Sequence, residues 1–215
     1  MKAVEIKNLS FKYKNTEKNI LNNINLSINE GEAVLVTGQS GSGKSTLCYC
    51  ICGLIPDLYS GDLEGEVLIY GKNTNEITIT EKVTNIGIIF QNPATQLFSP
   101  TIEDELAFGP ENLCVDREEI GKRIDYILKL LNMESYRFEN PNNLSGGQQQ
   151  LVAIASVLML NPKIIICDEI MSWVDEEGKD IIKKLMLQLK NEGKTLIMVD
   201  HGENIVIADR IIQIK

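Results

Sequence analysis

Four short stretches of the chain are almost continuously apolar, and they are spread along most of its length. They comprise residues 33–37, 86–90, 163–167 and 195–199, and Val, Ile and Leu dominate them. Unbroken runs of this kind are typical of strands buried on both faces of a parallel sheet. We therefore expect these segments to form the central sheet of an α/β fold, with helices in the sequence between them.

The first thirty residues follow a different pattern, in which apolar and polar residues alternate. The alternation covers residues 4–6, 9–13 and 24–28. Antiparallel strands with one face in solvent show this pattern. We expect these segments to form an antiparallel β subdomain beside the parallel sheet.

The segment between residues 116 and 131 has the spacing of a helix. The apolar residues that recur there every three or four positions are Ile120, Ile124, Ile127, Leu128 and Leu131. Pro110 and Pro141 are expected to end the helical pattern on either side. No repeat or linker divides the chain, so we expect one domain over residues 1–215. Its core and β layer comprise residues 1–91 and 161–215, and an inserted helical subdomain comprises about residues 92–160.

The charge balance and the apolar segments limit the class of protein. The 215 residues include 21 basic and 30 acidic residues, a formal net charge of −9, which disfavours a nucleic-acid partner. The N-terminus lacks the apolar core of a signal peptide, and the longest apolar stretch, residues 151–160, is too short to span a bilayer. We expect a soluble chain unless a partner holds it at a membrane.

The five cysteines do not have the paired spacing of a disulfide framework, which favours a reducing cytoplasm. Three of them are Cys48, Cys50 and Cys52, and residues two apart on a helix point away from each other. They cannot converge on one metal ion, so we expect them to be small buried residues.

A phosphate-binding loop follows the first apolar strand. The sequence Gly-Gln-Ser-Gly-Ser-Gly-Lys-Ser matches G-x-x-x-x-G-K-[ST] and stands before an apolar helix that begins near Thr46. Its residues are Gly38, Gln39, Ser40, Gly41, Ser42, Gly43, Lys44 and Ser45. Glycines let backbone N–H groups approach phosphate oxygens, and the helix N-terminus adds partial positive charge. Lys44 is expected to bind the β and γ phosphates, and Ser45 to bind Mg²⁺.

Two adjacent carboxylates, Asp168 and Glu169, follow the apolar strand of residues 163–167. The carboxyl ends of strands are where α/β sheets bind ligands. One acid can hold Mg²⁺ through water and the other can polarise an attacking water, so we expect Asp168 to bind metal and Glu169 to act as the general base. A pair of acids at a strand end is also common on ordinary surfaces.

A second glycine-containing segment, Leu-Ser-Gly-Gly-Gln, precedes the apolar helix of residues 151–160. Its polar and glycine residues are Ser145, Gly146, Gly147 and Gln148. A serine and two glycines at a helix N-terminus can form another anion cradle.

Taken in order, the phosphate loop, Gln91, the LSGGQ segment, Asp168-Glu169 and His201 resemble the motifs of ABC-type ATPases over essentially the whole chain. The resemblance implies a P-loop NTPase (RecA-like) fold and two such domains that sandwich two ATP molecules. The LSGGQ residues of one domain would face the nucleotide bound to the other. Gln91 would sense the γ-phosphate and Mg²⁺, and His201 would contact the γ-phosphate and the attacking water.

Tyr13 matches the aromatic residue that stacks on adenine in this family. Stacking of this kind is worth about 1–3 kcal/mol in base–aromatic contacts. The alternative is that Tyr13 is an ordinary strand aromatic beside Phe11.

A finer resemblance comes from residues 91–101, 103–105 and 107–112, and from residues 54–56 and 61–71. These segments are similar to the ATPase subunits of energy-coupling-factor (ECF) importers, which take up vitamins or transition-metal ions. The resemblance implies a homodimer, or a heterodimer with a second ABC ATPase subunit. It also implies a transmembrane coupling protein, a substrate-binding membrane subunit, and a peripheral position on the cytoplasmic face of the membrane.

The segment 91–112 is expected to form the docking groove for the coupling protein. If so, Leu97 or Phe98 should be partly exposed in the isolated chain, because interface anchors are apolar residues that fill a pocket on the partner. The alternative is that Leu97, Phe98 and Phe108 only pack the helical subdomain on the core.

Several positions depart from the family pattern. Ile170-Met171 stand where Pro-Thr is usual, Trp173-Val174 stand where a small residue and Leu are usual before Asp175, and Leu151 replaces a common Arg. The chain also stops at Lys215, without the C-terminal extension of many such subunits. These changes affect the expected D-loop geometry and choice of partner, not nucleotide binding. Three alternatives are a soluble ABC-type ATPase acting on DNA or ribosomes, a regulatory nucleotide-binding module with which residues 170–174 are compatible, and a simple P-loop kinase or GTPase.

Overall fold

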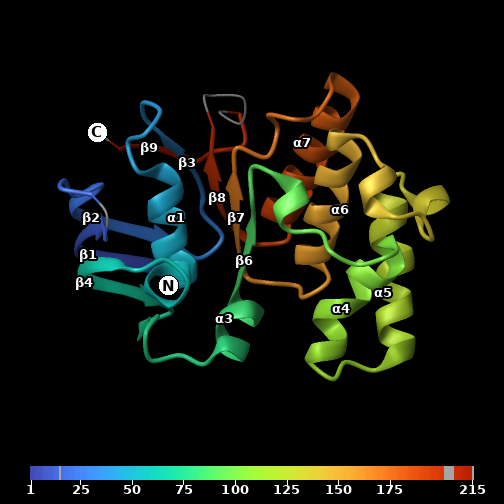
Figure 1. Ribbon diagram of the computed structural model, residues 1–215, viewed down its shortest axis with the longest axis horizontal. Coiled ribbons are helices and arrows are strands. Elements are labelled where there is room, and N and C mark those ends of the chain that lie inside the picture. The colour runs from blue at the N-terminus through green and yellow to red at the C-terminus, as the bar shows by residue number, and fades with distance from the viewer. Residues whose placement is uncertain (15, 201–205, 215) are drawn as a thin grey trace.

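The computed structural model describes residues 1–14, 16–200 and 206–214. An antiparallel sheet of strand order β2-β1-β4-β5 lies on the left of Figure 1. Its strands are β1 (Lys2–Tyr13), β2 (Leu21–Asn29), β4 (Gly61–Ile69) and β5 (Lys72–Asn73). The alternating segments of the sequence therefore form the antiparallel layer that they predicted.

Residues 4–6 and 9–13 belong to one continuous strand, in which the apolar alternation changes phase. Ile6 and Leu9 are both buried although three positions separate them. The pairing of β1 with β2 shifts register between these two residues, as it does at a β-bulge. Opposite them, Gly65 has φ +88°, and a Cβ there would lie 2.5 Å from the carbonyl oxygen of Asn8. A side chain at Gly65 would therefore separate β4 from β1.

The central sheet is parallel and has the strand order β6-β7-β8-β3-β9. Its strands are β3 (Ala33–Thr37), β6 (Ile86–Ile89), β7 (Ile164–Asp168), β8 (Thr195–Val199) and β9 (Arg210–Gln213). The four apolar runs supply four of these strands. The fifth, β9, was not predicted, because it is a short edge strand with mostly exposed side chains and therefore lacks an apolar run.

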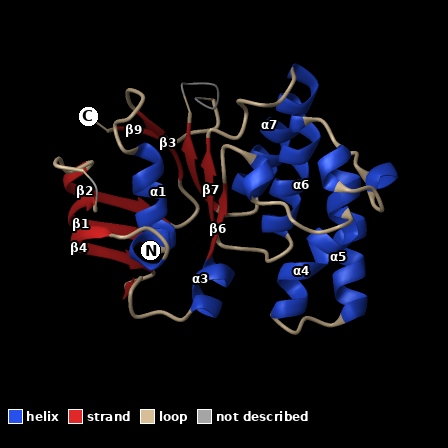
Figure 2. Ribbon diagram, viewed as in Figure 1, coloured by secondary structure: helices blue, strands red, loops and turns tan. Residues whose placement is uncertain are grey.

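Two hydrophobic cores lie on opposite faces of the central sheet. Val34 and Val36 pack with helix α1 (Lys44–Cys52) and the antiparallel layer. Ala33 and Leu35 pack on the other side against helices. The short helices α2 (Leu54–Asp57) and α3 (Ile79–Asn85) connect α1 to β4 and β5 to β6. Figure 2 shows the resulting order of β layer, central sheet and helices.

The helices on the right of Figure 1 are α4 (Ile102–Asn112), α5 (Arg117–Leu130), α6 (Gly146–Leu158) and α7 (Glu176–Asn191). Short 3₁₀ turns occupy Pro93–Thr95, Glu134–Tyr136 and Pro141–Asn143. Helix α5 buries the apolar residues Ile120, Ile124, Ile127 and Leu128, as their spacing predicted.

Pro110 does not itself end the helical pattern, because it lies inside α4 and the helix continues for two more residues to Asn112. A proline so close to a helix end removes one N–H bond but interrupts few further turns. No helix in the described ranges has both the length and the apolar character needed to cross a bilayer.

Candidate functional site

The phosphate loop connects the end of β3 to the start of α1. Gly43, the N-cap of α1, has φ +92°, and a Cβ there would lie 2.9 Å from the carbonyl oxygen of Ile20. At Gly38 a Cβ would lie 2.5 Å from the carbonyl oxygen of Ile214. Both positions therefore require glycine. Because no side chain of the described residues caps α1, its first N–H groups can face an anion.

Lys44 lies within this loop and its side chain is held close to the backbone. The ammonium group donates hydrogen bonds of 3.1 Å to the carbonyl oxygens of Gly38 and Gln39. Lys44 is also buried. Its positive charge is thus positioned beside the N-terminus of α1, where the helix dipole already favours an anion.

A cavity of about 300 Å³ brings together residues from four separate parts of the sequence. Its lining includes nine of the predicted site residues: Tyr13, Ser40, Gly41, Gly43, Lys44, Ser45, Thr46, Gln91 and Glu169. Gln39 and Ser42 line an adjoining cavity on the other side of the loop. Ile20 also lines the first cavity and was missed by the sequence analysis, because a single apolar residue in a polar loop gives no signal.

Two pairs of polar side chains lie at the end of β7, and three of these four residues line the cavity. The hydroxyl of Ser45 lies 3.1 Å from Oδ1 of Asp168, and the amide of Gln91 donates a 2.8 Å hydrogen bond to Oε2 of Glu169. Glu169 follows β7 and has φ +49°. This left-handed backbone conformation is unfavourable for any residue other than glycine. The strand end therefore directs Asp168 and Glu169 to two different partners.

The Ser45–Asp168 pair has the chemistry that Mg²⁺ requires. Mg²⁺ prefers oxygen ligands and is usually held by one or two carboxylates together with substrate phosphates. Within the described ranges, no cluster of three or more His, Cys, Asp or Glu could hold a metal by itself. The site offers one buried carboxylate and one hydroxyl beside a phosphate loop. This donor set suits Mg²⁺ bound together with a phosphate, and it does not suit a metal that needs protein ligands alone.

Burial raises the pKa of Asp168, and the neighbouring Glu169 raises it further. The hydrogen bond from Ser45 and the charge of Lys44 act in the opposite direction. Since the pKa is higher in the folded state than in the unfolded state, ionised Asp168 destabilises the metal-free fold. The stabilising contribution of the protonated form is complete at low pH and is lost as pH rises through the folded-state pKa.

We expect Asp168→Asn to stabilise the metal-free protein at neutral pH by about 1 kcal/mol, or roughly 2–4 °C in Tm, because it removes a buried charge. The difference should shrink as pH falls and wild-type Asp168 becomes protonated. Thermal melting in chelator over a pH series measures it. The same substitution at the exposed Asp62 should have little effect. A lower Tm for Asp168→Asn at neutral pH would contradict the assigned cost of the charge.

Tyr13 is placed so that both interpretations of this residue remain open. Its ring makes an edge contact with Phe11 at 4.8 Å between centroids, as the strand interpretation requires. Its hydroxyl lies 3.1 Å from Oγ1 of Thr46, and the side chain lines the phosphate-loop cavity. Stacking on a base stays a prediction.

The LSGGQ residues lie apart from the phosphate loop. Ser145 is the N-cap of α6 and forms a capping box with Gln148, in which each side chain accepts a hydrogen bond from the backbone of the other. Ser145, Gly147 and Gln148 line a cavity of about 280 Å³ that shares no residue with the phosphate-loop cavity. One chain therefore does not bring the two predicted halves of the nucleotide site together.

The positions that depart from the family pattern are mostly buried. Ile170, Met171, Val174 and Leu151 belong to the hydrophobic core on the helical side of the sheet. The turn around them is closed by backbone hydrogen bonds, including one from Val174 to Met171. Trp173 is 58% exposed, and its Cβ would lie 3.8 Å from a Cβ added to Gly146. The unusual residues thus extend the core and place one exposed aromatic beside LSGGQ.

The predicted cysteine role is confirmed for Cys48 and Cys50, which are buried, whereas Cys52 is partly exposed. Burial raises the pKa of Cys50 and of Cys52 to about 12. These thiols are therefore protonated at neutral pH. His201 lies outside the described residues.

A groove of about 540 Å³ adjoins the Ser45–Asp168 pair. Its aromatic wall comprises Tyr49, Tyr59 and Phe90, and the rings of Tyr49 and Tyr59 are stacked 5.2 Å apart. Ser45, Asp168 and Gln91 also line it, so the groove and the nucleotide cavity share residues. The sequence analysis did not single out these aromatic residues, because they lie on α1, after α2 and after β6 and converge only in the fold.

Phe98 and Phe108 form an exposed aromatic pair downstream of Gln91. Phe98 is 64% exposed and Phe108 49% exposed, and their rings meet edge to face at 4.7 Å. Leu97, in contrast, is partly buried and packs against the core. The expected exposure is therefore found at Phe98, while the packing alternative describes Leu97.

Comparison with known sequences defines the family. A model described as ABC transporter matches residues 21–172. A putative ABC transporter ATP-binding protein of Pyrococcus abyssi is 44% identical over 215 residues, covering 99% of this chain and 77% of the relative. The energy-coupling factor transporter ATP-binding protein EcfA1 of Mycoplasmoides gallisepticum is 41% identical over 211 residues, covering 98% of this chain and 74% of the relative.

Solved structures agree with this result. The structure of cbiO1 from Clostridium perfringens, part of the ABC transporter complex cbiONQ, superposes with a TM-score of 0.84 at 32% identity, covering 100% of this chain and 85% of that one. A dimeric ATP-binding cassette in a post-hydrolysis state with ADP and Pi superposes with a TM-score of 0.83 at 37% identity, covering 99% and 94%.

The parallel sheet and its phosphate loop define a P-loop NTPase. The chain belongs to the ABC transporter family, and it is an ATP-binding cassette ATPase.

Proposed function

We propose that this chain is the ATP-hydrolysing subunit of an ECF-type importer for a vitamin or a transition-metal ion. The observation that carries the proposal is the exposed Phe98–Phe108 pair, which follows Gln91 in the sequence by fewer than twenty residues. Contiguous exposed apolar side chains mark interaction sites more often than single ones do, and interface anchors fill pockets on the partner. The similarity to an energy-coupling factor ATP-binding protein over 98% of this chain supports the importer type.

The residues of the cavity account for ATP binding and hydrolysis. The loop N–H groups and Lys44 bind the phosphates, and Ser45 and Asp168 hold Mg²⁺, which supplies positive charge to the transferring phosphoryl group. Glu169 removes a proton from the attacking water, and Gln91 holds the Glu169 carboxylate in place through its 2.8 Å hydrogen bond. Tyr13 stacks on adenine, and His201 contacts the γ-phosphate.

A second ABC ATPase subunit completes the site, as a homodimer or a heterodimer. The separation of the LSGGQ cavity from the phosphate-loop cavity supports this step, because the two sets of residues share no wall within one chain. The dimeric state of a cassette 37% identical to this chain also supports it.

The transmembrane coupling protein docks at the aromatic groove and at Phe98. Since Ser45 and Gln91 line both this groove and the phosphate-loop cavity, a partner in the groove contacts the residues that respond to nucleotide. Docking places the ATPase on the cytoplasmic face of the membrane, and the cargo is bound by a separate membrane subunit.

We expect Phe98→Asp to reduce recovery of membrane partners by more than about tenfold, because a hot-spot residue contributes about 2 kcal/mol or more. The measurement is affinity purification of the tagged chain from detergent-solubilised membranes of its native cells, followed by identification of the captured proteins. ATP-induced melting shifts should be unchanged, since Phe98 does not line the phosphate-loop cavity.

Phe138→Asp is the matched control, because Phe138 is a similarly exposed phenylalanine outside segment 91–112. It should capture the same partners as wild type. Full capture by Phe98→Asp would contradict docking through this segment. Failure of the wild-type chain to capture any multispanning membrane protein would contradict the importer function itself.

A further inference from the structure

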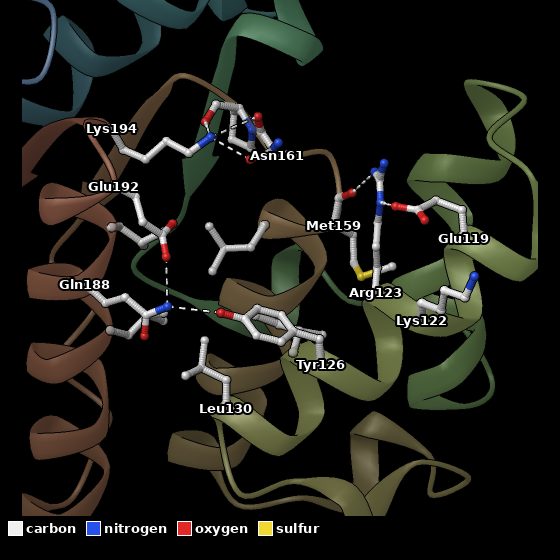
Figure 3. A pocket seen from close by; sticks show the side chains of 15 residues that line it. Glu119, Lys122, Arg123, Tyr126, Leu130, Met159, Asn161, Gln188, Glu192 and Lys194 are labelled. Atoms are coloured by element: carbon white, nitrogen blue, oxygen red, sulfur yellow. Dashed lines mark hydrogen bonds and ion pairs between the residues drawn. The ribbon is translucent and has the colours of Figure 1, made fainter.

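A cleft of about 380 Å³ lies between α5 and α7 (Figure 3). Both helices pack on α6. Pro162 and Lys194, which line the cleft, immediately precede the strands β7 and β8, whereas Asp168 and Glu169 lie at the far end of β7. The cleft shares no lining residue with the nucleotide cavity.

The floor of the cleft is apolar and already buried. It is formed by Ile127 of α5, Met159 after α6, and Leu185 and Leu189 of α7. Leu130 and Leu158 are only partly buried and form its side walls. A volume of this size with apolar walls is within the range of small-molecule sites.

Basic groups lie on the α5 side of the rim. Arg123 donates hydrogen bonds to Oε1 of Glu119 at 2.9 Å and to the carbonyl oxygen of Met159 at 3.1 Å. Its Nη2 makes no hydrogen bond with any residue that the structure describes. Lys122 stands beside it and pairs with the exposed Glu118. The guanidinium is therefore fixed in position while part of its donor capacity stays available.

The α7 side of the rim carries the opposite charge, and one hydrogen bond crosses the mouth. Gln188 donates through Nε2 to the hydroxyl of Tyr126 at 3.0 Å and to Oε1 of Glu192 at 2.8 Å, as Figure 3 shows. Lys194 does not add free positive charge, because its ammonium group is held by oxygens of Asn161 and Pro162. An anionic group is thus favoured only at the α5 side, near Arg123.

We propose that this cleft binds a small aromatic carboxylate and that its occupancy regulates the ATPase. The carboxylate pairs with Nη2 of Arg123 through a charge-assisted hydrogen bond, because Nε and Nη1 already bind Glu119 and Met159. The ring lies on the apolar floor and beside the ring of Tyr126. Glu192 on the opposite rim excludes the reverse orientation by repulsion.

The regulatory effect follows from the helices that the cleft shares with LSGGQ. Helix α6 begins next to Ser145 and ends at Leu158 in the cleft wall. Helix α7 begins next to Asp175, which lines the LSGGQ cavity, and passes the cleft at Leu185 and Leu189. A ligand that fixes the spacing of α5 and α7 therefore fixes the position of the LSGGQ end of the same helices.

The binding test uses 2-naphthoate as the probe, with isothermal titration calorimetry on the full chain. We expect saturable binding at one site, and Arg123→Gln should weaken it by about tenfold or more, because a charge-assisted hydrogen bond is lost. Lys129→Gln is the matched control, since Lys129 is an exposed cation of the same helix that does not line the cleft. The uncharged methyl ester should bind about tenfold more weakly or worse. Equal binding of ester and acid, or no saturation, overturns the proposal.

A second variant keeps the test decisive if Arg123→Gln unfolds. Leu158→Trp fills the cleft from its side wall and should abolish 2-naphthoate binding, with cooperative melting as the check on folding.

In wild type, saturating 2-naphthoate should change the dissociation constant of ATP by about fivefold, and ATP should change that of 2-naphthoate by the same factor. This coupling should be absent in Leu158→Trp. Unchanged ATP affinity in wild type overturns the regulatory role, and competition between the two ligands for one site overturns the location.

Discussion

Glu169→Gln is expected to lower ATP turnover by about 10²–10⁴-fold, the contribution typical of a positioned general base. The substitution removes the proton acceptor and changes little else. The side-chain oxygen of a glutamine can still accept the hydrogen bond that Gln91 donates at 2.8 Å, and the phosphate loop is untouched. ATP affinity should therefore stay within a few-fold of wild type. Phosphate release measures turnover, and equilibrium binding measures affinity.

Glu76→Gln is the control for this result, because Glu76 is an exposed residue that follows β5 and lines no nucleotide cavity. It should hydrolyse ATP as wild type does. Near-normal hydrolysis by Glu169→Gln would remove Glu169 from the role of base. The remaining candidate would then be His201, which lies outside the described residues.

The strands of the central sheet could be predicted because burial on both faces leaves a plain pattern. Val34 faces α1 while Leu35 faces the helices on the other side, so neither face tolerates polar residues. The edge strand β9 has no such constraint, since Arg210 and Ile211 are exposed. Its place beside β3 is set by pairing with a distant segment, which local sequence does not encode.

The phosphate site could be predicted because one continuous loop supplies most of it. Residues of the segment 40–46 meet Asp168 at the end of β7 and Glu169 after it, as the ends of their strands require. The aromatic groove could not be predicted in the same way. Tyr49 and Phe90 are 41 positions apart in the sequence. Their ring centroids lie 6.0 Å apart only because β6 and α1 lie side by side in the fold.

The departures after Glu169 show how packing can preserve a turn while its residues change. Ile170 and Met171 fill the core on the helical side, and Ser172 donates a hydrogen bond to the carbonyl oxygen of Glu169. Asp175 then caps α7 through a 2.9 Å bond from the N–H of Gly178. The sequence indicated that these positions were unusual, but only their burial explains why the turn can keep Glu169 in place.

Lys44→Ala should nearly eliminate the ATP-induced increase in thermal stability. At about 100 times the dissociation constant, a ligand stabilises the native state by about 2.7 kcal/mol. Loss of a charged hydrogen-bond donor weakens binding by up to about 100-fold, which would leave about 0.4 kcal/mol at the same ATP concentration. Thermal melting with and without ATP measures the difference for each variant against its own nucleotide-free form.

Lys82→Ala is the matched control for Lys44→Ala, because it also removes a buried lysine. Lys82 pairs with Asp57 at 2.7 Å, far from the phosphate loop in sequence and outside its cavity. Lys82→Ala should melt at a lower temperature, because the Asp57 carboxylate loses its ion-pair partner and α3 loses the packing of the Lys82 side chain. It should keep the full ATP-induced shift in melting temperature. Lys44→Ala also loses two bonds to the carbonyls of Gly38 and Gln39, so its nucleotide-free stability should fall as well. A full ATP shift in Lys44→Ala would mean that the phosphates bind without this lysine, and it would contradict the phosphate-loop assignment.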